Sequence, residues 1–361
     1  MKRYFFIVGE ASGDLHAANL IKELFRLNKN AKFQGFGGEN MQKEGLILTK
    51  HFNEMAFMGF WEVFMNLSTI RKNFKQAKKE LLEFNTDVLI LVDYPGFNMR
   101  MAKFAKKYNI KVVYYITPQI WAWKESRVNK LRRDVDLLIP VLPFERSFYA
   151  KHKIDVKYVG HPLLDALKDL DSKNIESEKP IIAVLPGSRK QEIASSLPIM
   201  MEVSKSFENY QFIIAGAPSI SLDYYRSITR DSYMPVLSNK THALLKECKA
   251  AIITSGTATL EAAILKAPQV VCYKTSFISY IIGKLLLKVK YITLVNLICD
   301  KEVVKELIQD DFNTDNLVKE LNRILNKKNR IQILSNYNEL IRLLGNAGAS
   351  KRAAIAINSL N

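Results

Sequence analysis

The segment Ser255 to Glu261 (SGTATLE) gathers small and hydroxyl-bearing residues in a pattern suited to phosphate binding. It follows the apolar run Ala251 to Ile253, which is typical of a buried parallel strand, and a helix is expected to begin near Ala258. The first N–H groups of that helix would face a diphosphate, and Gly256 would let the backbone approach it closely. An ordinary strand-to-helix turn of an α/β protein is the alternative interpretation.

Side chains of the same turn predict further contacts to a nucleotide. Ser255 or Thr257 is expected to cap the helix with its hydroxyl group. Glu261 falls about one turn into the helix, where its carboxylate could accept hydrogen bonds from ribose hydroxyl groups.

A second glycine turn follows the apolar run Ile181 to Leu185 and reads PGSR. Ser188 and Arg189 come just past the end of this expected strand. A guanidinium group at such a position can form a forked contact with a diphosphate and stabilise a departing nucleotide. Two turns of this kind are a more specific signal together than either is alone.

Asp93 is the candidate general base. It ends the buried run Val88 to Val92 and enters the turn DYPGFN, and ligands of open parallel sheets bind beyond the carboxyl ends of strands. A carboxylate fixed there suits proton abstraction from a hydroxyl group. A cap for a helix opening near Phe97 is the alternative interpretation.

The N-terminal turn Gly9 to Asp14 (GEASGD) lies between an expected strand, Tyr4 to Val8, and an expected helix, Leu15 to Leu27. Its spacing is not that of a dinucleotide fingerprint. We interpret it as a compact loop that positions a polar group of a ligand, with Glu10, Ser12 and Gly13 as candidates. The roles of Glu10, Asp14, His16 and His161 stay open between ligand contact, cap and core.

The segment Phe57 to Phe74 is unusually apolar for a helix that packs on one core. A helix from about Gly59 would have one narrow polar stripe and would lead directly into basic residues, which predicts a helix in a membrane interface that touches anionic head groups. It is too polar to span a bilayer. A helix buried on two sides by its own protein is the alternative. The predicted membrane or acyl-chain contacts are Phe60, Trp61, Phe64, Met65, Leu67, Arg71 and Lys72.

The 361 residues carry a formal net charge of +17, which favours a phosphate-bearing partner. The basic clusters lack the interleaved aromatic residues of single-strand binding surfaces, so nucleic acid is the weakest candidate partner. Three scattered cysteines indicate neither a disulfide framework nor a metal cluster. The opening run MKRYFFIVGE is too short for a signal peptide, and we expect a cytoplasmic protein.

Strands alternate with helices throughout, which predicts an α/β fold with parallel sheets. Further expected strands are Val112 to Ile116, Phe212 to Ala215 and Val270 to Tyr273, and Tyr291 to Asn296 is expected to return toward the sheet. The charged segment Lys168 to Pro180 marks a boundary between two units. We expect a first domain over residues 1–167, a second over 175–335 and a helical tail over 336–361.

Eight motifs in order resemble the lipid A disaccharide synthase family. They are Gly9 to Asp14, Met58 to Val63 (MGFWEV), Asp93 to Asn98, Pro118 to Trp123 (PQIWAW), Leu142 to Glu145 (LPFE), Val159 to Pro162 (VGHP), Leu185 to Arg189 and Ser255 to Glu261. The pattern departs from the family at Val295, where a proline usually precedes the asparagine. The resemblance makes Asn296 a candidate contact to UDP, although a lone asparagine in a loop more often satisfies backbone groups.

The resemblance implies an inverting glycosyltransferase of the GT-B architecture, with two Rossmann-like domains and a C-terminal helix that crosses back to the first. It implies UDP-2,3-diacylglucosamine as donor and 2,3-diacylglucosamine 1-phosphate (lipid X) as acceptor, with a β(1→6) lipid A disaccharide 1-phosphate and UDP as products. No cofactor and no metal are expected. The implied partners are the anionic inner membrane surface, where the protein would associate peripherally from the cytoplasm, and a second copy in a homodimer.

The sequence leaves two other functional classes open. A UDP-sugar epimerase is favoured by SGTATLE and LPGSR but leaves the apolar, basic segment unexplained. A non-catalytic basic binding protein would explain the charge but not the paired phosphate turns.

Overall fold

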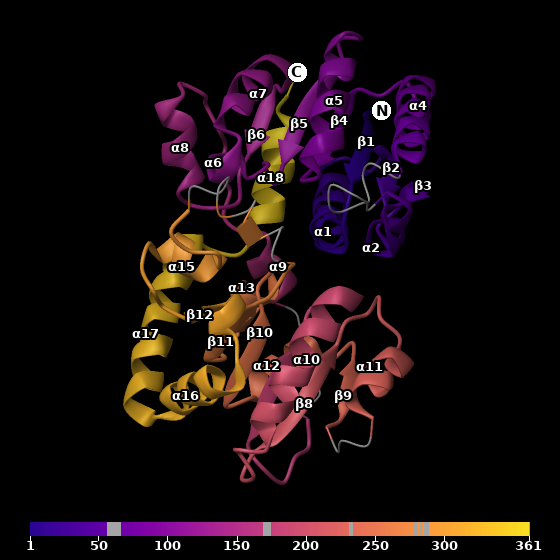
Figure 1. Cartoon of the computed structure of the whole chain (residues 1–361). Helices are drawn as coiled ribbons and strands as arrows, with labels where there is room; N and C mark the ends of the chain where they lie inside the picture. The colour runs from indigo at the N-terminus through magenta and orange to yellow at the C-terminus, as the bar shows by residue number, and fades with distance from the viewer. Residues whose placement is uncertain are drawn as a thin grey trace. The chain divides into compact units, whose positions relative to one another are not determined.

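The computed structural model describes residues 1–55, 66–168, 175–230, 234–276, 280–281, 284 and 289–360. The chain forms two compact units, one of Met1–Asp169 with Leu344–Asn361 and the other of Leu170–Leu343. Each unit contains a six-stranded parallel sheet with helices on its faces, which confirms the predicted α/β class with two Rossmann-like domains (Figure 1).

The sheet of unit 1 has the order β3-β2-β1-β4-β5-β6. Its strands are β1 (Arg3–Val8), β2 (Lys32–Gly37), β3 (Leu46–His51), β4 (Val88–Val92), β5 (Lys111–Tyr115) and β6 (Leu137–Ile139). This is the strand order of a dinucleotide-binding fold, whose direction of winding reverses between β1 and β4.

Alternating residues of the central strands face two different cores. Phe6, Val8 and Ile90 belong to the cluster that packs against α1 (Ala11–Leu27), whereas Ile7 and Leu91 belong to the cluster on the opposite face. The second cluster packs against α5 (Pro95–Lys106) and α7 (Val128–Asp134). Both faces of these strands are therefore buried, which explains why they read as continuous apolar runs.

The remaining helical segments of unit 1 border the sheet. They are α2 (Glu39–Lys43), η1 (Phe52–Glu54), α4 (Leu67–Glu83), α6 (Ile120–Trp123), η2 (Glu125–Arg127), α8 (Glu145–Lys151) and α9 (Leu163–Ala166).

The sheet of unit 2 repeats the same winding, with the order β12-β11-β10-β7-β8-β9. Its strands are β7 (Ile181–Leu185), β8 (Gln211–Gly216), β9 (Val236–Ser238), β10 (Ala250–Thr254), β11 (Gln269–Tyr273) and β12 (Lys305–Ile308). The direction of winding reverses between β7 and β10. The two glycine turns found in the sequence follow these two strands, so they share one edge of the sheet.

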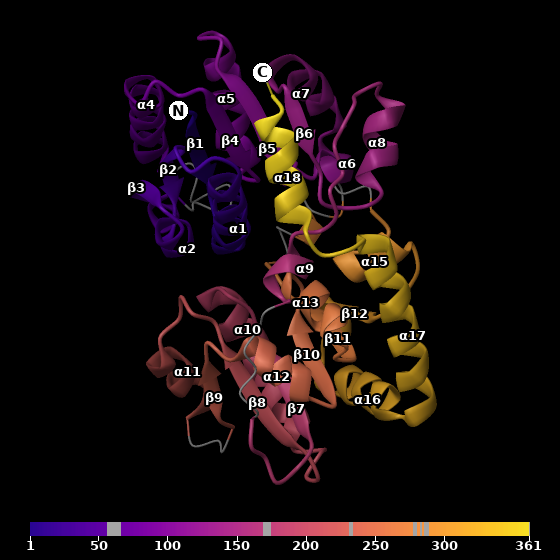
Figure 2. The ribbon, with the colours of Figure 1, turned by 180° about the vertical axis from the view of Figure 1, so that it is seen from behind.

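The helices of unit 2 are α10 (Lys190–Ser204), α11 (Leu222–Thr229), α12 (Thr241–Glu247), α13 (Ala258–Ile264), α15 (Leu294–Cys299), α16 (Thr314–Leu325) and α17 (Lys327–Leu344), with η3 (Gln309–Asp311). Figure 2 shows α16 beside β10 and β11. Segment Tyr291 to Asn296 was expected to return to the sheet, but its last three residues begin α15 because the Thr293 hydroxyl group accepts from the Asn296 N–H and caps that helix.

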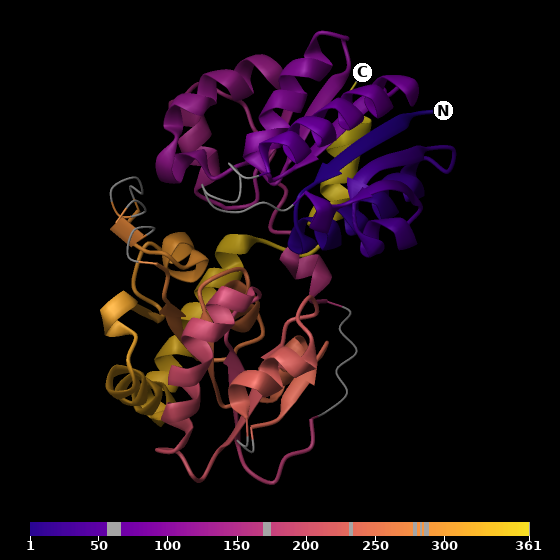
Figure 3. The ribbon, with the colours of Figure 1, turned by 45° about the vertical axis from the view of Figure 1, so that its right-hand side comes forward.

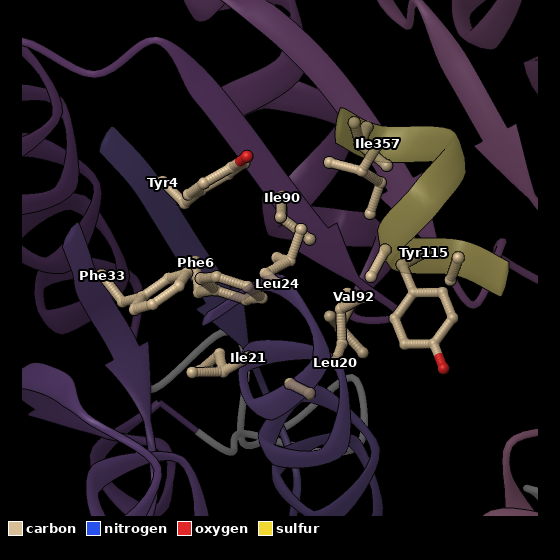
Figure 4. Packing of buried hydrophobic residues seen from close by; sticks show 14 of the residues in the cluster. Tyr4, Phe6, Leu20, Ile21, Leu24, Phe33, Ile90, Val92, Tyr115 and Ile357 are labelled. Atoms are coloured by element: carbon tan, nitrogen blue, oxygen red, sulfur yellow. The ribbon is translucent and has the colours of Figure 1, made fainter. Parts of the chain in front are cut away.

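The last helix, α18 (Ala349–Asn358), returns to unit 1 and packs against α1. Its buried face consists of Ala349, Ala353, Ala354 and Ile357. Figure 4 shows Ile357 above the same sheet face as Ile90 and Val92, and in Figure 3 the yellow helix lies behind the first strand. The expected tail boundary at residue 336 falls inside α17, whose helical pattern continues to Leu344.

In the part of the chain that the structure describes, no helix is long and apolar enough to cross a membrane. The predicted interfacial contacts Phe60, Trp61, Phe64 and Met65 lie outside the described residues. Leu67 opens α4 with 42% of its surface exposed, and Arg71 and Lys72 are also exposed on this helix.

Candidate active site

Asp93 stands directly after β4, where the backbone takes an unusual path. Asp93 and Tyr94 have φ angles of 44° and 46°, a conformation that side-chain-bearing residues rarely adopt. The backbone of Asp93 is held on both sides: its N–H donates to the Ile116 carbonyl over 3.2 Å, and its carbonyl accepts from Asn98 Nδ2 at 2.8 Å and from the Tyr114 hydroxyl at 2.6 Å. Two strained residues fixed in this way are a feature of functional sites.

The carboxyl group of Asp93 does not cap the following helix. Helix α5 has Tyr94 at its N-cap position and receives no side-chain cap, so the alternative interpretation of Asp93 as a helix cap is wrong. Burial, together with the negative charge of Glu10, raises the pKa of Asp93 to about 7, while the Tyr94 N–H opposes the shift. A carboxylate with a pKa near neutrality is suited to general-base work at physiological pH.

Glu10 and Ser12 lie next to this strand end, although not in the loop that the sequence predicted. Helix α1 begins at Ala11, so Ser12, Gly13 and Asp14 form its first turn, and Glu10 is the N-cap residue with an extended backbone. Ser12 Oγ donates to Glu10 Oε1 over 2.5 Å. The helix begins early because residues at its first turn need no intrahelical partner for their N–H groups, so glycine and serine are tolerated there.

The two glycines of this turn are required by packing. A Cβ atom at Gly13 would lie 2.8 Å from Val8 Cγ1, and one at Gly9 would lie 2.5 Å from the Tyr94 ring. Gly13 is therefore a close-packing residue between α1 and the strand ends, which leaves Glu10 and Ser12 as the polar groups of this turn that can face a ligand.

Asp14, His16 and His161 are core residues. Asp14 accepts hydrogen bonds from the N–H groups of Gly38, Asn40 and Met41 and so caps α2. The rings of His16 and His161 meet edge to face at 6.4 Å. Burial, with a contribution from His16, lowers the pKa of His161 to about 3, so this ring is neutral and accepts the Leu163 N–H on Nδ1.

Glu145, the last residue of the LPFE motif, organises the segment that follows β5, a role that the sequence did not indicate. Its buried carboxylate accepts from the Thr117 hydroxyl, from Trp121 Nε1, and from the N–H groups of Val141 and Leu142. The motifs PQIWAW and LPFE are thus two halves of one hydrogen-bonded assembly. The positions of these motifs were visible in the sequence, but nothing local indicated that they meet.

In unit 2, the turn after β7 is occupied by a carboxylate from its own helix. Glu192 Oε2 accepts from the N–H groups of Ser188 and Arg189 at 3.0 and 3.3 Å, and Glu192 Oε1 lies 2.8 Å from Arg189 Nη1. Gly187 has a φ of +120°, and a Cβ atom there would lie 2.6 Å from that of Glu192. An anionic group therefore already sits at the position where the sequence predicted an anionic ligand.

The turn after β10 is partly used by the fold. The Ser255 N–H donates to the Cys272 carbonyl over 2.8 Å, so it extends the sheet and is removed from the predicted diphosphate contacts. The predicted cap is also wrong, because Thr257 already has a helical backbone and α13 receives no side-chain cap. Gly256 is open: a Cβ atom there would meet no heavy atom within 4 Å.

The last two predicted nucleotide contacts, Glu261 and Asn296, differ in whether their side chains are left to bind a ligand. Glu261 is half-buried, and its Oε2 lies 2.9 Å from Nε2 of His242 on α12. Asn296 is fully buried, and its amide is used completely: it accepts from the N–H groups of Val303 and Val304 and donates to the Val304 carbonyl and to Glu306. An amide group with four partners has no capacity left for a ligand, so we withdraw Asn296 as a UDP contact.

A cavity of about 1170 Å³ is lined by residues such as Lys179, Gln211 and Phe212. These residues lie where β7 and β8 begin, at the edge opposite the glycine turns, so the cavity is separate from the candidate site. Among the described residues, no group of three His, Cys, Asp or Glu side chains is placed to hold a metal ion.

Residues 4–360 match the family model of lipid-A-disaccharide synthetase. The chain is 36% identical to the lipid-A-disaccharide synthase of Geobacter metallireducens, over 98% of this chain and 96% of that protein. It is 34% identical to the synthase of Coxiella burnetii, over 99% and 98%.

Solved structures share the fold at low sequence identity. The UDP-GlcNAc 2-epimerase from Neisseria meningitidis bound to UDP-GlcNAc is 14% identical with a TM-score of 0.69, covering 99% of this chain and 100% of that chain. CalG4, the calicheamicin glycosyltransferase, is 13% identical with a TM-score of 0.62, covering 99% and 98%. At such identities the likeness shows the architecture alone.

Proposed function

This chain belongs to the lipid-A-disaccharide synthetase family of glycosyltransferases, and from that premise we propose how its own residues catalyse the family reaction. The reaction joins UDP-2,3-diacylglucosamine to lipid X and gives the β(1→6) disaccharide 1-phosphate and UDP. It belongs to lipid A biosynthesis. The observation that carries the proposal is the fixed, partly buried Asp93 at the end of β4, with a pKa raised to about 7.

The proposed step is a single displacement. The acceptor 6-hydroxyl oxygen forms a bond to the anomeric carbon of the donor, on the face opposite the nucleotide. Its proton passes to the Asp93 carboxylate, and the bond between the anomeric carbon and the diphosphate breaks, so UDP leaves with the electron pair. Because attack and departure occur on opposite faces, the configuration at the anomeric carbon inverts.

The proposed UDP site uses both glycine turns of unit 2. Ser188 and Arg189 would contact the diphosphate together with the backbone at Gly256, Thr257 and Ala258, and Glu261 would hold the ribose. The Ser188 and Arg189 N–H groups now face the Glu192 carboxylate, which supports the proposal because it shows that the turn accommodates an anionic oxygen. Donor binding would require the diphosphate to replace Glu192 or to bind Arg189 beside it.

We also propose that the protein associates with the anionic inner membrane surface from the cytoplasm. Both substrates are acylated, and the exposed Leu67, Arg71 and Lys72 follow an apolar segment in the sequence. Exposed cations beside an apolar surface favour binding to anionic head groups. A homodimer stays a prediction. Light scattering of the detergent-free protein tests it by measuring the molar mass in solution.

The test of the proposed reaction is UDP release from UDP-2,3-diacylglucosamine in detergent, with and without lipid X and in the presence of a chelator. Release that depends on lipid X, together with a lipid disaccharide, supports the proposal. Consumption of UDP-N-acetylglucosamine alone would indicate an epimerase. Release that stops when the chelator is added would contradict the expectation that no metal takes part.

A further inference from the structure

Arg127 is a partly buried cation that packs against an aromatic ring. It ends η2, and its guanidinium group lies over the Trp123 ring, 5.2 Å from the ring centroid. Among the described residues no carboxylate lies within ion-pair distance of it. Glu125, on the same turn, pairs instead with His152 Nε2 at 2.9 Å.

The neighbouring arginines on α7 show the contrast. Arg133 forms a two-bonded pair with Asp134, with both distances at 2.7 Å. Arg132 donates to Asn129 and to the His152 carbonyl. Within the described ranges, Arg127 is thus the arginine of this region that has no hydrogen-bonded or ionic protein partner, so its N–H donors can serve a group outside the fold. Its burial lowers its pKa, so a nearby anion would relieve the cost of desolvating the charge.

The chain brings Arg127 to the same sheet edge as Asp93. Residues 116–127 follow the carboxyl end of β5, which pairs with β4 through Val92 and Tyr115. Neighbouring strands lie about 4.8 Å apart, which is the scale of one hexose ring. Tyr114 links the two groups: its hydroxyl donates to the Asp93 carbonyl, and the charges of both Asp93 and Arg127 act on its ionisation.

We propose that Arg127, held over Trp123, binds the 1-phosphate of the acceptor and so orients its 6-hydroxyl toward Asp93. This inference rests on the proposed function. C1 and C5 of a hexopyranose both flank the ring oxygen, so the C1 phosphate and the C6 hydroxyl lie about one ring width apart. An acceptor whose 6-hydroxyl meets Asp93 therefore presents its phosphate to the neighbouring strand end. A guanidinium fork matches a phosphate monoester in geometry and charge.

Two nearby groups support a phosphate here. The Lys124 ammonium lies 4.2 Å from the centroid of the same Trp123 ring, so a second cation is within reach of one anion. Trp123 is 38% exposed, which leaves the ring and its two cations accessible. A lipid head group has the same phosphate chemistry, but the edge shared with Asp93 favours the acceptor over a bulk lipid.

The experiment compares Arg127→Gln with wild type on two acceptors, lipid X and 2,3-diacylglucosamine without phosphate. Loss of charge-assisted bonds should raise KM for lipid X by about 10- to 100-fold, leave KM for the donor unchanged and barely affect the phosphate-free acceptor. Arg127→Lys keeps the charge without the fork, so it should recover part of the loss. Lys130→Gln, an exposed neighbour on α7, is the matched control and should behave as wild type.

Equilibrium binding of lipid X to the UDP-bound protein, measured by calorimetry, separates this inference from the proposed reaction because it needs no turnover. Weaker binding of lipid X, but not of its phosphate-free analogue, to Arg127→Gln supports the inference even if no disaccharide forms. An equal effect on both acceptors would overturn it. So would reduced partition of Arg127→Gln into phosphatidylglycerol vesicles with an unchanged acceptor preference, because that result would assign the arginine to lipid head groups.

Discussion

At the residue scale, the ionisation of Asp93 sets the predicted pH dependence. A general base must be deprotonated, so kcat/KM should rise with pH and level off above a midpoint near the Asp93 pKa of about 7. Asp93→Asn should lower turnover by about 10²–10⁴ while UDP still binds. Steady-state rates across pH 5 to about 9, with UDP affinity from calorimetry, provide the measurement, and near-normal turnover in the variant would remove Asp93 from this role.

Glu10 offers a second residue-scale prediction, because its charge helps to raise the Asp93 pKa. Glu10→Gln keeps the shape of the side chain and removes the like charge, so the acidic limb of the rate profile should move to lower pH. Glu23→Gln is the control. Glu23 lies near the C-terminal end of α1, whereas Glu10 precedes its first turn, so this variant should leave the rate profile at the same pH. A profile that stays in place in Glu10→Gln would show that burial alone sets the Asp93 pKa.

The same raised pKa has a consequence for stability. The folded pKa of about 7 lies above the ordinary value of 3.8, so the folded state favours the protonated acid. The contribution of protonated Asp93 to the free energy of unfolding is complete below a pH of about 3.8, and it is lost as the pH rises through 7. At pH 8 the Asp93→Asn protein should therefore unfold at a temperature no lower than wild type, which also shows that its loss of activity does not come from misfolding.

Residues differ in how far their roles could be predicted. The position of Asp93 after a strand was predicted because a local signal, the end of the apolar run Val88 to Val92, determines it, whereas its role as a base stays a prediction. The prediction that Asn296 contacts UDP failed because the partners of its amide group, Val303, Val304 and Glu306, acquire their positions only when β12 joins the sheet. A polar side chain can be recognised in a sequence, whereas the groups that satisfy it belong to the fold.

At the element scale, Gly256→Ala distinguishes a phosphate turn from an ordinary strand-to-helix turn. The added methyl group meets open space and the backbone is not in the left-handed region, so the thermal unfolding temperature should stay within experimental error. A diphosphate that approaches the backbone would meet this methyl group, and UDP affinity should fall by about tenfold or more. Calorimetric titration with UDP measures the change.

Gly96→Ala is the matched control for that experiment. A Cβ atom at Gly96 also meets no heavy atom within 4 Å, but Gly96 belongs to unit 1, whereas the proposed UDP turns belong to unit 2. Its UDP affinity should equal that of wild type. Equal affinities in both variants would favour the ordinary turn and would remove the Gly256 backbone from the proposed site.

Helix α18 is held to unit 1 by a carboxylate at its start. Asp165 accepts from the N–H groups of Gly348 and Ser350, which are among those left without partners in the helix itself. Asp165→Asn weakens these contacts, and loss of a helix cap costs about 1 kcal/mol, which corresponds to about 2–4 °C in Tm for a unit of this size. Asp315→Asn, an exposed first-turn residue of α16, is the control. An unchanged Tm in Asp165→Asn would mean that the apolar face of α18 alone holds it.

The sequence predicted the central strands except β2 and missed the edges. β1, β4, β5, β7, β8, β10 and β11 were expected within one residue of their ends, because both of their faces are buried and they form apolar runs. β2, which lies between β3 and β1, was not expected because its sequence KFQGFG contains two glycines and polar residues instead of an apolar run. The four edge strands β3, β6, β9 and β12 were not expected either. They are short or partly exposed, so their sequences alternate or carry charges, as in the KELI of β12.

At the scale of the whole molecule, the two units repeat one strand order with unrelated loops. Each unit has its strand-end turns at one edge of its sheet, with the proposed base in unit 1 and the proposed nucleotide turns in unit 2. The different proposed roles of the two units follow from the side chains that stand at their strand ends. The return of α18 to unit 1 was implied by family resemblance, since nothing within residues 349–358 identifies the partner of its apolar face.

The net charge of +17 predicts salt-dependent binding to anionic vesicles, and α4 provides a way to test where the charge acts. Arg71 and Lys72 are exposed on α4 directly after the apolar segment, so Arg71→Glu with Lys72→Glu should strongly reduce co-sedimentation with phosphatidylglycerol vesicles. Lys327→Glu with Lys328→Glu makes the same change in net charge on exposed residues of α17. If charge acts through α4, only the first pair should release the protein, and its kcat in detergent should be retained. An equal loss in both double variants would show that binding depends on the net charge of the molecule, and the interfacial role of the segment before α4 would then be rejected.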